Sequence, residues 1–160
     1  MKCFFLFLAF YTVTSSLNAQ RISDSILNIR QSIVNSGFVC KWVEKPFSLR
    51  DPGYSIPIFS DHAETFSLRE GIVKGIRVVN KRFLVLIESN DSVFVYSNLS
   101  YVRCEVGKCL RKGDLIGTIS KDDEEIKFEL EFGILVKSSR KSLNFIELFR
   151  FLCREFDVKS

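Results

Sequence analysis

The chain contains one histidine, His62, and this limits the chemistry that its side chains can do. The histidine stands in the polar segment Asp61-His62-Ala63-Glu64, which is typical of a surface loop. A catalytic imidazole needs a second group that orients it. The sequence offers neither a serine nucleophile elbow nor a glycine-rich loop leading into a helix. We therefore expect His62 to be a solvated side chain and not a general base.

Two carboxylates, Glu129 and Glu131, have the spacing of an acid/base pair. They alternate with apolar residues in the segment 126–132, which is the pattern of a strand with one face in the core. Lys127 lies on the same side of that strand. The sequence therefore favours a solvated charged face over a catalytic pair.

Four cysteines follow the first 19 residues: Cys40, Cys104, Cys109 and Cys153. In an exported protein an even number of cysteines permits disulfides, and four cysteines allow three pairings, among which the sequence does not choose. Cys104 and Cys109 flank an expected turn at Gly107, which makes a local bridge between them a candidate. Their spacing is poor for a four-cysteine zinc site.

Residues 1–19 have the features of a secretory signal peptide. Lys2 precedes an apolar stretch that ends at Val13, and Ala19 fits the position before a cleavage site. The stretch is too short to span a bilayer. We expect export across the inner membrane to the periplasm or the cell exterior, with no stable membrane span after cleavage. The mild positive charge is interleaved with acidic residues throughout, which argues against a nucleic-acid partner.

The rest of the chain is expected to be an amphipathic helix over 20–37 followed by one β domain over 38–160. Isoleucines at 22, 26, 29 and 33 have helical spacing, and Gly37 can end the helix. Segments 71–79, 83–87 and 92–96 are β-prone and separated by short turns, which predicts an antiparallel meander. A final helix can start at Ser142 or Asn144, with Glu147 completing a capping box. The predicted fold is mainly β, with two antiparallel sheets or a twisted half-barrel and a helix at each end.

Several of these segments together resemble the M23 family of zinc peptidases, the lysostaphin/LytM type. That family has a "G-x-V" strand, a hairpin, "Y-x-H-L", a glycine-rich "V-x-x-G-x-x-V-x-x-G-x-x-I-G" element and "H-L-H-F-E", in this order. The resemblance covers about residues 46–148. The matching pieces are Gly71-Ile-Val73, Tyr96-Ser-Asn-Leu99, Val106, Gly113-Asp-Leu-Ile-Gly117 and Ile126-Lys-Phe-Glu-Leu130.

The residues that hold and assist zinc in that family are replaced here. The resemblance puts Asn98 at the "Y-x-H-L" histidine and Glu125 and Lys127 at the two histidines of "H-x-H"; a shift of four residues gives Glu129 and Glu131 instead. The "H-x-G-x-D" segment falls near 51–56, where Asp51 is a register-dependent candidate. We expect no zinc, no catalytic residues, and a vestigial groove lined by Asn98, Glu125, Lys127 and Glu129.

The resemblance then implies a duplicated hybrid motif fold and a non-catalytic module of the cell envelope. Such a module would bind a cell-wall hydrolase, another envelope protein or a peptidoglycan peptide. Two alternatives stay open from the sequence. One is an active peptidoglycan metallopeptidase with non-standard ligands, and the other is a structural protein of the export pathway or the cell surface.

Overall fold

The computed structural model of the chain describes residues 26–30, 32–40, 45–48, 51–121 and 127–156. The predicted signal peptide, residues 1–19, lies outside them. Twelve strands and one helix fill the described part. The strands are β1 (Ile26–Arg30), β2 (Ser36–Cys40), β3 (Lys45–Ser48), β4 (Asp51–Ser60), β5 (Glu64–Phe66), β6 (Gly71–Val79), β7 (Arg82–Ser89), β8 (Ser92–Val102), β9 (Cys109–Leu110), β10 (Leu115–Ile119), β11 (Phe128–Val136) and β12 (Lys141–Ser142).

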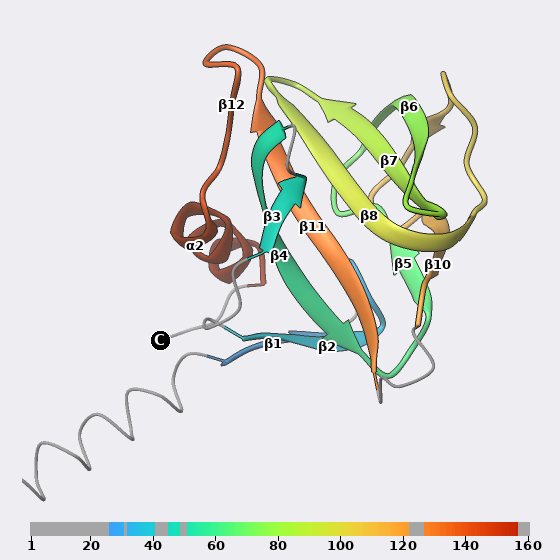
Figure 1. Ribbon diagram of the computed structural model, residues 1–160, viewed down its shortest axis with the longest axis vertical. Helices are drawn as coiled ribbons and strands as arrows, with labels where there is room; N and C mark the ends of the chain where they lie inside the picture. The colour runs from blue at the N-terminus through green and yellow to red at the C-terminus, as the bar shows by residue number, and fades with distance from the viewer. Residues whose placement is uncertain (1–25, 31, 41–44, 49–50, 122–126, 157–160) are drawn as a thin grey trace, which may run out of the picture.

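The strands form one connected antiparallel sheet, in the order β1-β2-β4-β11-β8-β7-β6-β9. Strand β10 pairs with β5 and β8, while β3 pairs with β4 and β12 with β11. The long strands β4, β11 and β8 run side by side through the middle of the molecule (Figure 1). The mainly β, antiparallel prediction is confirmed, with one connected sheet in place of two separate ones.

The meander β6–β7–β8 follows the predicted turns closely. Asn80 and Lys81 both have positive φ, 50° and 64°, and Asn90 has a φ of 52°. Two consecutive left-handed residues give the turn that matches the twist of a two-residue hairpin. Within β7, Val85 and Ile87 are buried and Leu84 and Leu86 are half-buried. The five consecutive apolar residues from Phe83 to Ile87 therefore have buried or half-buried side chains on both faces of the strand.

The predicted N-terminal helix over 20–37 is wrong in the part that the structure describes. Residues 26–30 form β1, which pairs antiparallel with β2 from Ile26↔Cys40 to Arg30↔Ser36. Between these strands, Ile33 and Val34 are adjacent in sequence and both fully buried. Isoleucine and valine are stiff at χ1 and favour extended backbone, so sheet pairing prevails over the helical spacing, and Gly37, the expected helix end, lies within β2.

The C-terminal helix α2 (Phe145–Glu155) begins as predicted. The Asn144 side chain accepts a hydrogen bond from the Glu147 amide, and the Glu147 carboxylate accepts one from the Asn144 amide, which completes the capping box. The helix packs against β4, and Phe151 contacts Phe94 of β8 with ring centroids 6.1 Å apart. In the part of the chain that the structure covers, no helix has the length and apolar character of a membrane span.

The core lies on the face of the sheet that α2 covers. Alternate residues of β4, β8 and β11 point into it, because the side chains of a strand alternate between faces. Phe94 is 5% exposed, and the other central side chains are 2% exposed or less: Ile56, Ile58, Tyr96, Leu130, Phe132 and Ile134. The site that the sequence predicts must therefore lie on the opposite face or at the strand ends.

Candidate functional site

Asn98 marks the point where one edge of β8 changes its partner. Residues Ser92 to Ser97 pair with β11, whereas Leu99 to Val102 pair with β10. Asn98 itself has a φ of 63°, a left-handed conformation that asparagine tolerates better than most residues. This irregularity lets two strands share one edge of β8.

Both polar groups of Asn98 hold the two neighbouring strands. Its carbonyl oxygen accepts a hydrogen bond from the Ser120 amide, at 2.7 Å, just after β10. Its side-chain nitrogen Nδ2 donates to the Glu129 carbonyl oxygen of β11, also at 2.7 Å. The residue at the "Y-x-H-L" histidine position therefore has a clear structural role, because it closes the gap between β10 and β11.

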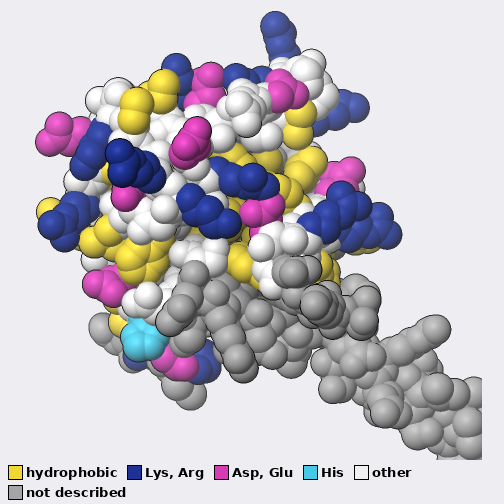
Figure 2. Space-filling view, turned by 180° about the vertical axis from the view of Figure 1, so that it is seen from behind, with side chains coloured by type: hydrophobic (Ala, Val, Ile, Leu, Met, Phe, Trp, Pro, Cys, Tyr) yellow, Lys and Arg dark blue, Asp and Glu magenta, His cyan; other side chains and the backbone are white. Residues whose placement is uncertain are grey.

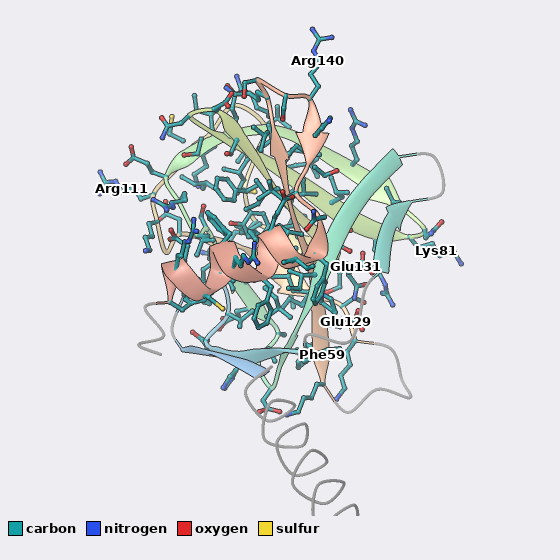
Figure 3. The ribbon with its side chains drawn as sticks, turned by 90° about the vertical axis from the view of Figure 1, so that its left-hand side faces the viewer. Phe59, Lys81, Arg111, Glu129, Glu131 and Arg140 are labelled. Carbon is teal, nitrogen blue, oxygen red and sulfur yellow. The ribbon has the colours of Figure 1, made fainter. Side chains whose placement is uncertain are left out.

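Glu129 and Glu131 lie on the sheet face opposite α2. They pair with β4 at Phe59 and Pro57 respectively, and Figure 3 shows Phe59, Glu129 and Glu131 along these two neighbouring strands. The prediction that both carboxylates are solvated is wrong for Glu129, which is only 5% exposed, and Glu131 is half-buried. Pro57 and Val95 are also buried on this face, so most of it is covered, whereas Glu131 remains partly accessible.

Lys127 immediately precedes β11 and forms an ion pair with Asp61, which immediately follows β4. The Lys127 Nζ lies 2.5 Å from the Asp61 Oδ1. Lys127 lowers the pKa of the Asp61 carboxyl below its usual 3.8, mainly through the hydrogen bond that it donates and secondly through its positive charge. Both side chains are partly exposed, so water screens this pair. The pair joins the ends of the two strands on which the resemblance places metal ligands.

The structure brings three of the four predicted groove residues to one region. The Asn98 side chain bonds to the Glu129 backbone, and Lys127 lies two residues before Glu129, immediately before β11 begins. Glu125 lies outside the described residues. With the register shifted by four, Glu129 and Glu131 take the two histidine positions, and this alignment puts both of them in β11, beside Asn98. The sequence missed Asp61 because its contact with Lys127 joins residues 66 positions apart.

The described residues do not fit a zinc site. No three histidine, cysteine, aspartate or glutamate side chains among them converge on one point, whereas a tetrahedral site needs at least three protein ligands. The Asn98 nitrogen is a donor already used by Glu129. His62 is exposed in the turn after β4, where its amide donates to the Ser60 hydroxyl at 3.0 Å. For Asp51 the structure gives only its place as the first residue of β4.

The predicted bridge between Cys104 and Cys109 is not formed. Both are free thiols, with Cys104 buried in the core and Cys109 exposed in the short edge strand β9. The turn around Gly107 separates the two side chains into different environments instead of joining them. Burial raises the pKa of the Cys104 thiol, and that of Cys153 on α2, so both favour the neutral form.

A hollow of about 670 Å³ lies elsewhere, where β6 begins and β7 ends. Three carboxylates line it, from Glu70, Glu88 and Asp114. Glu88 forms ion pairs with Lys137 at 2.9 Å and with Lys74 at 3.4 Å, and the Asp114 carboxylate accepts a hydrogen bond from the Arg111 amide. These contacts account for two of the three carboxylates as parts of local structure.

Comparison with solved structures shows the M23 peptidase fold. Lysostaphin from Staphylococcus simulans superposes with a TM-score of 0.54 at 18% identity, covering 75% of this chain and 52% of lysostaphin. Its catalytic domain alone gives 0.50 at 15%, covering 68% of this chain and 90% of that domain. The catalytic domain of the prophage-encoded M23 protein EnpA from Enterococcus faecalis gives 0.50 at 11%, covering 76% and 89%.

These identities establish the fold alone. The chain spans about half the length of full lysostaphin and most of the length of the isolated catalytic domains. No protein-family model and no curated protein matches the sequence. Basic and acidic side chains are interspersed over the back of the molecule, as the mild net charge predicts (Figure 2).

Proposed function

We propose that this chain is a non-catalytic cell-envelope module with the M23 peptidase fold, which binds a cell-wall hydrolase or a peptidoglycan peptide. The observation that carries the proposal is the hydrogen bond from the Asn98 amide to the Glu129 backbone. It gives a structural role to a position where the family has a histidine, and His62, the single histidine of the chain, lies in an exposed turn. Peptide-bond hydrolysis by a zinc-bound water needs ligands that the described residues do not supply.

The surface proposed for binding is the end of β4 and β11 around Lys127, Asp61 and Glu131. These side chains are at least partly exposed, so a partner can reach them. The region carries both charge signs, which suits a partner that also presents both. The features of a signal peptide in residues 1–19 support the proposal, because they predict export to a compartment in which such partners occur.

Metal analysis and an activity assay test the non-catalytic part of the proposal. We expect the purified protein to contain no stoichiometric zinc and to leave cross-linked muropeptides intact. One tightly bound zinc per chain, with muropeptide turnover that a chelator abolishes, would instead establish an active metallopeptidase with non-standard ligands.

Capture from an envelope extract and retention on purified peptidoglycan test the binding part. We expect Lys127→Glu to reduce capture or retention, because it reverses a charge at the centre of the surface and sets it against Asp61. Lys137→Glu is the matched control, since Lys137 follows the other end of β11 and also forms an ion pair with a carboxylate, that of Glu88. Equal binding by both variants would exclude this surface, and no binding by the unaltered protein would favour a purely structural role.

A further inference from the structure

Strand β6 leaves part of its outer edge without a neighbouring strand. Strand β9 pairs only with Gly71 and Ile72, and the next residue, Val73, bonds to the turn at Gly107 and Lys108. A bulge follows between Val73 and Gly75. Beyond it, no described strand pairs with the outer edge of residues 75–79, while their inner edge pairs with β7. An open edge of this kind can accept a further strand.

The hairpin register identifies which backbone groups point outward. Val79 and Arg82 flank the two-residue turn, and such a flanking pair exchanges hydrogen bonds across the hairpin. Because bonded and non-bonded pairs alternate in antiparallel strands, Arg77 bonds inward to Leu84, whereas Ile76 and Val78 direct their amides and carbonyls outward. The edge therefore presents two backbone amides and two backbone carbonyls, from Ile76 and Val78. Their spacing allows hydrogen bonds to one further strand, either antiparallel or parallel to β6.

The side chains beside these groups divide by face. Ile76 and Val78 share one face with Phe83, and Val78 is 65% exposed although it is apolar. Arg77 is exposed on the other face, together with Val79, which is 42% exposed, and Lys81 lies at the outer end of the hairpin (Figure 3). The open edge is thus apolar on one face, and its other face carries the basic Arg77 beside the apolar Val79.

We propose that this edge of β6 binds an extended segment of a partner protein in which acidic and apolar residues alternate. Apolar side chains of that segment would pack on Val78, and its carboxylates would face Arg77 and Lys81. A second copy of this chain fits poorly, because antiparallel pairing of β6 with β6 through Ile76 and Val78 would set the two Arg77 side chains directly opposite each other. The inference is independent of the proposed surface at Lys127, which lies on other strands.

Two blocked synthetic peptides test the proposal with the purified protein: acidic Glu-Val-Glu-Val-Glu-Val and basic Lys-Val-Lys-Val-Lys-Val. We expect only the acidic peptide to bind in titration calorimetry and to protect the Ile76 and Val78 amides from hydrogen exchange. Val78→Pro removes one outward donor without removing a β6–β7 bond, and should weaken binding by about tenfold or more. Val78→Thr keeps the donor and should bind within about threefold of the unaltered protein.

Three results would overturn the proposal. The first is equal binding of the acidic and basic peptides. The second is unaltered affinity in Val78→Pro, provided that its thermal unfolding midpoint shows an intact fold. The third is a concentration-dependent dimer in sedimentation that Val78→Pro dissociates, since a second copy would then occupy the edge. Arg77→Glu gives a separate check on charge, because it should abolish the preference for the acidic peptide.

Discussion

Two regions of the sheet differ in how strongly they restrict the residue type at a position. One is the corner where β10 pairs with β8, and the other is the junction at the ends of β4 and β11. At Gly117 in β10, an added Cβ would lie 2.1 Å from the Tyr101 carbonyl oxygen, so the backbone itself excludes a side chain. At the junction, Lys127 and Asp61 form a screened pair that other residues could replace without a clash. The sequence motifs that resemble the M23 family include Gly117, which is a position of the first kind. Backbone contacts of this kind can maintain a fold whichever residues stand at positions of the second kind.

Gly117→Ala should have the largest effect on the free energy of unfolding. The Cβ would meet backbone atoms of β8, which cannot rotate away, and we expect a loss of about 3 kcal/mol in the free energy of unfolding. Gly75→Ala is the control, because its Cβ would make an ordinary 3.6 Å contact with Leu86. Urea denaturation of both variants measures the difference. Similar stabilities would show that the corner relaxes and that its backbone does not fix the residue.

Tyr96→Phe should have an intermediate effect. The fully buried Tyr96 hydroxyl accepts a hydrogen bond from the Leu68 amide at 2.9 Å, and its removal leaves a buried donor without that acceptor. We expect a loss of about 1–3 kcal/mol in the free energy of unfolding. Tyr101→Phe, at a side chain that is 61% exposed, should change stability little. Equal effects of the two substitutions in the same denaturation assay would contradict the role given to Tyr96.

Lys127→Met should have the smallest effect on the free energy of unfolding, but it should change the pKa of Asp61 clearly. Removing the amine removes both causes that lower the pKa of Asp61 most, so this pKa should rise toward 3.8. NMR titration of the carboxyl carbons measures it. The Glu88 carboxyl, whose pKa Lys137 lowers chiefly through a hydrogen bond, is an internal control that should not move.

The same variant has a consequence for stability against pH. The folded-state pKa of Asp61 lies below its unfolded value, so the pair stabilises the protein above the unfolded pKa of about 3.8. That contribution is lost as the pH falls through the folded pKa. Lys127→Met should therefore lose less stability on acidification than the unaltered protein. An identical loss in both would show that the pair does not couple to folding.

Local signals predicted the elements that depend on few residues. Asn144 and Glu147 form a capping box within one turn of helix, and Asn80-Lys81 forms a two-residue turn, so both are readable from short segments. Glu129 was placed on the correct face by alternation, yet its burial depends on what covers that face. The N-terminal helix failed for the same reason, because β1 exists only through its pairing with β2. Contacts between distant segments are absent from a local pattern.

The left-handed backbone at Asn98 has a consequence for the range of residues this position can accept. Aspartate, asparagine and histidine are the non-glycine types enriched at positive φ. The histidine of the family motif and the asparagine found here thus belong to the same small group of tolerated residues. An exchange between them can leave the path of β8 unchanged, and the asparagine then ties β11 through its amide. Replacing Asn98 by histidine or aspartate should therefore keep the course of β8, whereas a β-branched residue at this φ would strain the backbone.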